Sequence, residues 1–215
     1  MKKLLSLWKK YSYLVLLAFI VLGLLDFRIA IAAVVCMVAP IIVSVFKGRF
    51  WCGNLCPRGS FYDNVVSTFS NNKKVPQFLK SRLFRTIVVV IMMTMFALGV
   101  NKNWGDLYGI GLVFYRMIVI TTIVGIILSL FYNQRTWCHF CPMGTFASVI
   151  SKFRKSKNVL QVSSDCVSCK ICEKKCSIGI VPYEYKENIL SHPDCIQCGK
   201  CVNACPKNAI GYNKN

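Results

Sequence analysis

Two cysteine runs near the C-terminus share one spacing: Cys166-x2-Cys169-x2-Cys172-x3-Cys176 and Cys195-x2-Cys198-x2-Cys201-x3-Cys205, the latter followed by Pro206. In each run three cysteines are separated by two residues, so a tight loop can point three sulfur atoms at one centre. The fourth cysteine follows after a longer gap and can serve as a ligand of a different centre. The runs therefore predict a pair of similar metal sites.

This spacing is typical of two-cluster bacterial ferredoxins, in which the fourth cysteine of each run ligates the other cluster. It predicts two [4Fe-4S] clusters with crossed ligation. Cys166, Cys169, Cys172 and Cys205 would hold one cluster, and Cys195, Cys198, Cys201 and Cys176 the other. Zinc is the alternative, because four-cysteine zinc sites also use x2 spacings, although this longer pattern occurring twice is much rarer among them.

The rest of the chain has the composition of a membrane protein. Hydrophobic residues make up 55% of its 215 residues, and the mean hydropathy is +0.50. Four apolar segments stand out, each extended by flanking aromatic or basic residues toward the length that spans a bilayer. These segments are Tyr11–Leu25, Ile29–Phe46, Thr86–Val100 and Met117–Tyr132. We expect a four-helix transmembrane domain over residues 1–157 and an α+β two-cluster ferredoxin-like domain over residues 158–215.

The positive charge of the chain is concentrated between these apolar segments. Residues 1–157 contain twenty Lys or Arg and three acidic residues, within a net charge of +19 for the whole chain. Nearly all of these basic residues lie in the leader, in residues 47–85 and after Tyr132, which places those segments and both termini in the cytoplasm of a cell-membrane protein. No recognition motif accompanies the charge, so we do not expect nucleic-acid binding.

An internal repeat follows each pair of apolar segments. Arg49-x-Trp51-Cys52 and Cys56-Pro-x-Gly-Ser-Phe61 match Arg135-x-Trp137-Cys138 and Cys141-Pro-x-Gly-Thr-Phe146. The same position after a helix pair predicts two parallel repeats in the membrane. If the repeats pack about a pseudo-two-fold axis, the sulfur atoms of Cys52, Cys56, Cys138 and Cys141 converge near the inner membrane surface.

Three interpretations of these four cysteines remain open. They can form a third metal site holding iron–sulfur or zinc, a redox-active dithiol pair, or turns with only a structural role. A disulfide is disfavoured on a reducing face of the membrane. We expect Trp51 and Trp137 to lie at the membrane interface, and His139 to be exposed there.

Two connections carry further expectations. Asn101–Gly111 is expected to form a long outer loop, and Ser177–Asp194 a turn with two short strands. No phosphate-binding loop, dinucleotide fingerprint or catalytic triad is present in the sequence, so no catalytic residue is assigned.

Together, the paired Trp-Cys-x(2,3)-Cys-Pro-x-Gly repeats and the ferredoxin runs resemble the NapH- and NosR-type membrane ferredoxins, over about residues 14 to 211. The resemblance implies an integral membrane electron carrier that links the quinone pool or a cytoplasmic donor to a partner reductase or flavoprotein. It assigns metal binding to Cys52, Cys56, Cys138, Cys141 and the eight ferredoxin cysteines. This sequence departs from the pattern by its x2 spacing in the second repeat and by having no large extracytoplasmic flavin-binding domain.

We therefore expect an electron-transfer subunit of an oxidoreductase complex, rather than a self-contained enzyme, with membrane lipid and a redox protein as partners and a quinone as a further candidate. The alternative is an accessory factor for metal-centre assembly or redox sensing.

Overall fold

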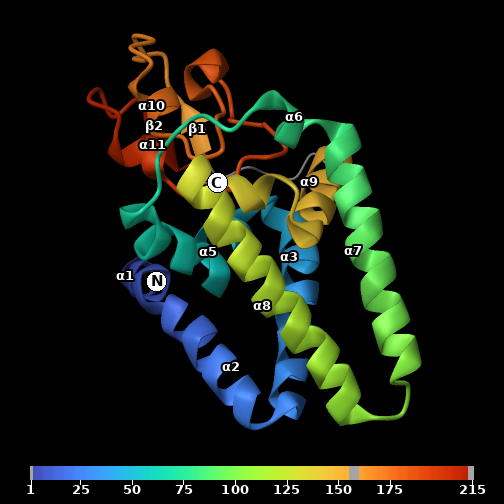
Figure 1. The fold of residues 1–215 in the computed structure, drawn as a ribbon. Helices are drawn as coiled ribbons and strands as arrows, with labels where there is room; N and C mark the ends of the chain where they lie inside the picture. The colour runs from blue at the N-terminus through green and yellow to red at the C-terminus, as the bar shows by residue number, and fades with distance from the viewer. Residues whose placement is uncertain (1, 155–159, 213–215) are drawn as a thin grey trace.

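The structure is a computed structural model that describes residues 2–154 and 160–212. It is mostly helical, and its long helices lie in the first two thirds of the chain (Figure 1). These helices are α1 (Lys2–Tyr11), α2 (Tyr13–Leu25), α3 (Ala33–Lys47), α7 (Arg82–Lys102), α8 (Leu107–Phe131) and α9 (Pro142–Arg154). Shorter helices connect them: η1 (Phe27–Ala32), α4 (Phe50–Asn54), α5 (Pro57–Asn64), η2 (Val66–Thr68), α6 (Gln77–Lys80) and η3 (Thr136–His139).

Three helical stretches are long and apolar enough to cross a membrane: Phe27–Lys47, Arg82–Lys102 and Leu107–Phe131. At 1.5 Å per residue, 21 residues reach about 32 Å, the thickness of a hydrocarbon core. Leu4–Tyr11 and Tyr13–Leu25 make a fourth span if this pair, bent by 44°, is counted as one. The described chain thus has three to four candidate spans, where the sequence predicted four.

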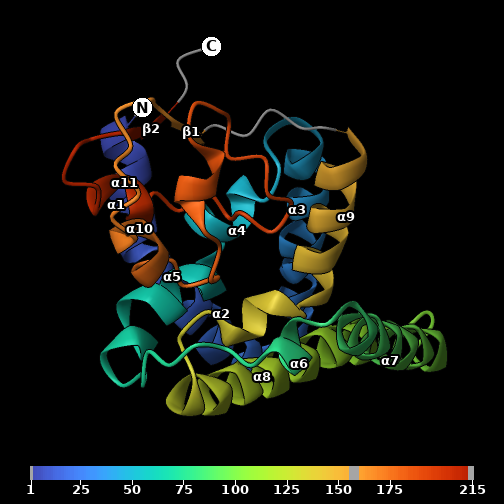
Figure 2. The same cartoon turned by 90° about the horizontal axis from the view of Figure 1, so that it is seen from above.

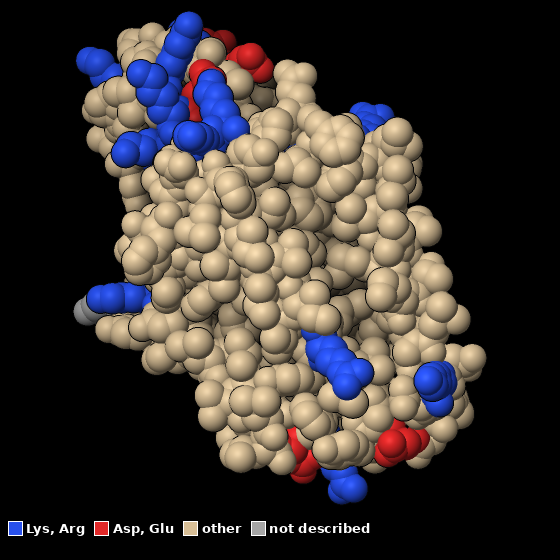
Figure 3. Space-filling view, in the orientation of Figure 1, with Lys and Arg blue, Asp and Glu red and all other residues tan. Residues whose placement is uncertain are grey.

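The candidate spans are arranged as two pairs that turn at the same end of the molecule. Figure 1 shows the α2–η1 connection and the α7–α8 connection together at the end opposite the C-terminal segment. The pairs meet where α8 packs against η1, and α9, which follows the second pair, packs against α3. Figure 3 shows a broad uncharged band across this face, with many Lys and Arg gathered beyond it at the end of the C-terminal segment.

The connection between α7 and α8 is shorter than the sequence suggested. The expected outer loop Asn101–Gly111 is wrong, because α7 continues to Lys102 and α8 begins at Leu107. Asp106 explains the early start of α8: its carboxylate accepts hydrogen bonds from the backbone N–H groups of Tyr108 and Gly109, each at 3.0 Å. An acidic cap of this kind satisfies amides that have no partner within the helix.

The C-terminal segment lies over the ends of α1, α3 and α4 (Figure 2). It contains β1 (Leu160–Val162), α10 (Ile171–Lys174), η4 (Pro182–Tyr185), α11 (Lys200–Asn203) and β2 (Ile210–Tyr212). The strands pair antiparallel, with Val162 opposite Ile210. Their apolar side chains and several cysteines form one core cluster. The expected domain boundary between residues 157 and 158 lies outside the described residues.

The two strands expected within Ser177–Asp194 are not formed. This stretch has the 3-10 helix η4 and two single-residue bridges, from Lys186 to Val162 and from Ile189 to Gln161. Glu187 lies between the bridges in the left-handed region at φ 66°. That conformation turns the chain sharply and prevents a continuous strand.

Candidate metal centres

The ferredoxin cysteines line two separate cavities. Cys166, Cys169, Cys172 and Cys205 line one cavity, with Ala209 and Ile210 in its wall. Cys176, Cys195, Cys198 and Cys201 line the other, with Leu160, Ile178, Ile180 and Leu190. We call them the Cys166 cavity and the Cys195 cavity. Each contains three cysteines of one run and the fourth cysteine of the other run, which is the combination that the sequence predicted.

The two runs adopt the same backbone conformation, position by position. Residues in the left-handed region recur 29 positions apart, as do the short helices α10 and α11. The left-handed pairs are Ser168 and Gln197, Lys170 and Gly199, and Gly179 and Asn208. Four of these residues are not glycine, and such conformations are uncommon for residues with a Cβ. The repeated loops are therefore two copies of one cysteine-presenting turn.

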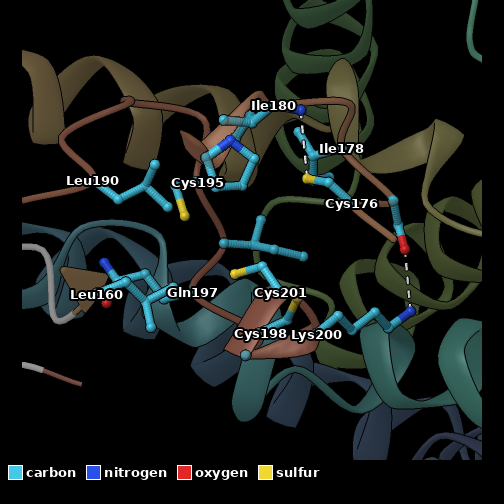
Figure 4. Close-up of a pocket in the computed structure, with 14 residues that line it drawn as sticks. Leu160, Cys176, Ile178, Ile180, Leu190, Cys195, Gln197, Cys198, Lys200 and Cys201 are labelled. Carbon is cyan, nitrogen blue, oxygen red and sulfur yellow. Dashed lines mark hydrogen bonds between the residues drawn. The ribbon is translucent and has the colours of Figure 1, made fainter. Parts of the chain in front are cut away.

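Alternating right- and left-handed residues turn successive backbone N–H groups to one side. Such nests bind anions and are found at many iron–sulfur sites. In the Cys195 cavity the N–H of Ile180 donates to the Sγ of Cys176 at 3.4 Å (Figure 4). Figure 4 also shows the sulfur atoms of Cys176, Cys195 and Cys201 facing the space between apolar side chains.

Burial controls the protonation of these thiols. It raises the pKa of both Cys195 and Cys201 to about 12. Neutral thiols are therefore favoured until a metal displaces the protons, because coordination deprotonates a thiol outright. The cavities have apolar walls and several sulfur atoms, and backbone N–H groups point toward the sulfur. These surroundings suit a metal cluster with negatively charged thiolate ligands. The residues present thus fit an iron–sulfur cluster in each cavity.

No set of three or more His, Cys, Asp or Glu is arranged around a single metal ion within residues 2–154 and 160–212. In a cube the four thiolates attach to four different irons, so they stand farther apart than the ligands of one ion.

The other four predicted cysteines come from the two repeats. Cys52 lies in α4, and Cys56 precedes Pro57 at the start of α5. Cys138 lies in η3, and Cys141 precedes Pro142 at the start of α9. The two prolines take the first helical position, where a missing N–H costs nothing.

These four cysteines affect one another electrostatically. Burial raises the pKa of the Cys52 thiol, and the nearby Cys138 and Cys141 raise it further, although Arg49 opposes them. Burial raises the pKa of Cys56 to about 12, with a further contribution from Cys52. We call this group of four the boundary site.

Two buried arginines connect the repeats reciprocally. Arg49, from the first repeat, donates to the carbonyl oxygen of Cys138 in the second repeat at 2.8 Å. Arg135, from the second repeat, donates to the carbonyl oxygen of Cys52 in the first repeat at 2.8 Å. Each guanidinium also fills the space beside a glycine of the opposite repeat, since a Cβ on Gly59 would lie 2.8 Å from Arg135 and one on Gly144 would lie 2.6 Å from Arg49.

Each arginine has one carboxylate partner. Arg135 pairs with Asp63 at 2.6 Å, and Arg49 pairs with Asp194 at 2.9 Å. Burial alone would raise the pKa of Asp63, but Arg135 and Lys200 outweigh it and hold that pKa well below its ordinary value. In the same way Arg49 and Arg85 outweigh burial and hold the pKa of Asp194 at about 2. Both carboxylates are therefore charged partners of buried cations.

Several buried polar atoms beside the boundary site have no hydrogen-bond partner in the described structure. They are the Nε of Arg49, the indole nitrogens of Trp51 and Trp137, and the Nε2 of His139. Buried donors without acceptors are costly, and each calls for an explanation such as an absent ion or cofactor. Hydrogen-bond donors beside four thiols are the surroundings that suit a negatively charged group bound at this site.

The boundary site lies directly against the Cys195 cavity. A Cβ on Gly53 would come within 2.0 Å of the carbonyl oxygen of Ile196 and 3.2 Å of the amide nitrogen of Cys198. Gln197 donates to the carbonyl oxygen of Lys47 at 2.7 Å, and Asn54 donates to the carbonyl oxygen of Gln197 at 3.1 Å. Cys52 and Cys138 also pack against the same core cluster as the ferredoxin cysteines.

Two expectations near this site are wrong. His139 is buried, not exposed, and burial lowers its pKa to about 3. Trp137 is also buried, because its ring packs edge-on against Phe140 inside the helical domain, so it is not a belt residue that faces lipid. Sequence reasoning also assigned no role to Arg49, Arg135, Asp63 or Asp194. The one available signal was an arginine three positions before the first cysteine of both repeats.

Comparison with known protein families supports the same chemistry. A 4Fe-4S binding domain model matches residues 29–76 and again residues 114–159. A 4Fe-4S dicluster domain model matches residues 165–210. The first model therefore covers both cysteine repeats, and the second covers the eight ferredoxin cysteines.

Three curated proteins are similar to the chain. The uncharacterized protein MJ0749 of Methanocaldococcus jannaschii is 26% identical over 209 residues, which is 94% of this chain and 78% of that protein. The methylamine utilization ferredoxin-type protein MauN of Methylobacillus flagellatus is 28% identical over 61% of this chain and 49% of its own length. The putative electron transport protein YccM of Escherichia coli is 25% identical over 81% of this chain and 54% of its own length. No solved structure matches the chain.

The chain therefore carries 4Fe-4S ferredoxin-type domains and is an iron–sulfur electron-transfer protein, with several apolar helices of the kind found in membrane proteins.

Proposed function

We propose that this chain is an integral membrane electron carrier of the NapH and NosR type. It passes single electrons between a cytoplasmic donor or the quinone pool and a partner redox protein. The observation that carries the proposal is the close packing of the boundary site against the Cys195 cavity, where Gly53 meets the backbone of Ile196 and Cys198. Redox groups held at these places would form a continuous series from the ferredoxin segment to the membrane domain.

The ferredoxin cysteines would hold two [4Fe-4S] clusters. Their ligands would be Cys166, Cys169, Cys172 and Cys205 for one, and Cys195, Cys198, Cys201 and Cys176 for the other. The composition of the two cavities supports this crossed assignment. Clusters of this kind take up and release one electron at a time, at potentials set by hydrogen bonds to sulfur and by solvent exposure.

Cys52, Cys56, Cys138 and Cys141 would hold a third cluster. Three observations support a cluster over a dithiol or a purely structural turn: the match of a 4Fe-4S binding model to both repeats, the unpaired buried donors, and the reciprocal arginines. Arg135 also approaches the boundary sulfurs directly, with Nη1 at 3.7 Å from the Sγ of Cys138. Such a donor would stabilise negative charge on the sulfur atoms.

Both termini and all three sites would face the cytoplasm. Arg28 and Lys102 are the basic residues of the two expected outer turns, whereas the leader, residues 47–85 and the region after Tyr132 are rich in Lys and Arg. This asymmetry is the orientation signal of membrane proteins. The cytoplasm is also the side of the membrane on which cysteine thiolates stay reduced.

Removing two expected ligands of the Cys195 cavity tests the proposal. In anaerobic membranes, Cys198→Ala with Cys201→Ala should abolish reduction of the co-purified redox partner by dithionite-reduced methyl viologen added on the ferredoxin side. The partner should keep its normal cofactor content. Cys36→Ser is the control, because Cys36 belongs to none of the three sites.

Normal partner reduction by the double variant would contradict electron transfer through this chain. A partner that lacks its own cofactors in the double variant would instead support the accessory role in metal-centre assembly.

A further inference from the structure

The Cys166 cavity has an exposed thiol among its lining residues. Of the eight ferredoxin cysteines, all within the described residues, Cys169 is the exposed one. Val167 and Ile171 flank it, with 62% and 39% of their surface exposed. Val167 and Ile171 therefore form a small exposed apolar spot beside a predicted redox ligand.

Lysines surround this apolar spot. Lys170 and Lys174 lie at the start and end of the α10 turn, and Lys207 lines the Cys166 cavity itself. All three are exposed. We call Val167, Cys169, Ile171, Lys170, Lys174 and Lys207 the Cys169 face. Figure 3 shows Lys and Arg gathered over the end of the molecule where Figure 1 labels α10.

Two of the nearby acidic residues, Glu173 and Asp165, have partners, and Glu184 is exposed beside Tyr183 of the cavity wall. Glu173 lies 3.5 Å from the Nζ of Lys74 and accepts a hydrogen bond from the Tyr183 hydroxyl at 3.4 Å. Asp165 accepts a hydrogen bond from the Ser163 hydroxyl at 3.1 Å. The lysines of the Cys169 face therefore give the surface around the apolar centre an excess of positive charge.

The loop of the Cys195 cavity is covered by the membrane domain. Lys9 of α1 donates to the carbonyl oxygen of Cys198, and Gly53 of α4 packs on Ile196. The Cys166 cavity is on the α10 side of the C-terminal segment, at the end of the molecule away from the α2–η1 and α7–α8 connections (Figure 1). A partner in solution can reach it without entering the bilayer.

We propose that the Cys169 face is the docking surface for a soluble, acidic one-electron carrier protein. The inference rests on the proposed function and adds the place and the chemistry of the encounter. Acidic groups of the carrier meet the lysines, and an apolar patch on the carrier covers Val167 and Ile171. One electron passes in each encounter, so the carrier is oxidised by one electron as the protein is reduced by one, with no bond made or broken.

Charge complementarity determines the kind of carrier. Lysines on the rim of a small interface mainly accelerate association and make it sensitive to salt, whereas a central apolar contact excludes water. A weak, fast and salt-dependent complex is typical of electron-transfer encounters. Anionic lipid is the other source of negative charge, and its contribution is separated in the test below.

The test uses the full-length protein in zwitterionic nanodiscs and an acidic plant-type [2Fe-2S] ferredoxin as the probe. Binding of the oxidised ferredoxin is measured by biolayer interferometry. Charge reversal by Lys170→Glu, Lys174→Glu and Lys207→Glu together should weaken binding about tenfold or more, and salt should weaken binding of the unaltered protein. The corresponding Lys→Gln triple variant should bind the ferredoxin more weakly than the unaltered protein and more tightly than the Lys→Glu variant. Lys152→Glu is the matched control, because Lys152 is an exposed lysine on α9, across the molecule from α10 in Figure 2.

Reduction rates separate the inference from the proposed function. Reduced ferredoxin should reduce the Lys→Glu variant about tenfold more slowly, while the methyl viologen radical, a small reductant that needs no docking, should reduce all variants equally. Equal ferredoxin binding by the triple variant and the control, or no binding by the unaltered protein, overturns the inference. If the triple variant changed the binding of the protein to anionic lipid but not its binding of the ferredoxin in zwitterionic nanodiscs, the face would be a lipid-binding surface. That result would also overturn the inference. Failure of methyl viologen to reduce any variant would instead contradict the proposed function.

Discussion

Arg49 and Arg135 are the residues on which the packing of the two repeats depends. Each side chain is about 1% exposed, and burying such a charge costs several kcal/mol unless it is paired and hydrogen-bonded. Each has a carboxylate and a carbonyl oxygen of the opposite repeat. At the repeat position equivalent to Asp63 the second copy has Ser148, which hydrogen-bonds to Asp194. The ferredoxin segment thus supplies the carboxylate that the second repeat lacks.

Asp63→Asn should be strongly destabilising. It leaves the buried guanidinium of Arg135 without its charged partner, a change that typically costs about 3–5 kcal/mol. The midpoint of thermal unfolding in detergent should fall markedly, with loss of bound iron. Asp26→Asn is the control, since Asp26 is an exposed cap and Asn caps helices almost as well. Equal midpoints for the two variants would contradict the role assigned to the Asp63–Arg135 pair.

The cysteines and the internal repeat were visible in the sequence because both are patterns of spacing. The specific ferredoxin spacing predicts crossed ligation, which stays a prediction, and each cavity is lined by the four cysteines that it assigns to one cluster. The reciprocal arginines could not be predicted, since they join residues 72 to 145 positions apart. Such contacts depend on how two helix pairs pack, and a single sequence does not encode that packing in any local period.

At the scale of elements, apolar periodicity identified the spans better than their ends. Thr86–Val100 and most of Met117–Tyr132 lie inside α7 and α8, but α7 begins earlier, at Arg82, and α8 begins earlier, at Leu107. Caps determined the difference, because the side chains of Ser81 and Asp106 accept hydrogen bonds from first-turn amides. The strands expected in Ser177–Asp194 failed for a similar local reason, the left-handed Glu187.

The contact between α4 and the ferredoxin loop of Ile196 and Cys198 connects the membrane helices to the C-terminal segment. We call this contact the joint. Gly53→Ala should separate the two, because the new Cβ would overlap the carbonyl oxygen of Ile196. We expect a loss of about 1–3 kcal/mol in stability and slower electron exchange between the boundary site and the rest of the protein. Unfolding midpoints and freeze-quench EPR after rapid reduction measure the two effects.

Gly211→Ala is the control for that experiment, since a Cβ on Gly211 meets nothing within 4 Å. Identical reduction kinetics and stability for Gly53→Ala and Gly211→Ala would show that the joint has no such role.

At the scale of the whole molecule, the orientation in the membrane follows from the distribution of charge. A fluorescent protein fused after Asn215 should mature, because the fusion point would be cytoplasmic. An alkaline phosphatase reporter inserted after Gly105, between α7 and α8, should be active, because that point would lie outside. An active phosphatase after Asn215 and an inactive one after Gly105 would reverse the proposed orientation.

The central claim is that three iron–sulfur cubes are held by one chain, and iron and acid-labile sulfide measured on anaerobically purified protein test it most directly. Three cubes predict about twelve iron atoms and twelve sulfides per chain, and Cys52→Ser with Cys138→Ser should lower both to about eight. EPR of the reduced double variant should retain the signals of the two ferredoxin clusters. About eight irons in the unaltered protein, unchanged in the double variant, would contradict the account.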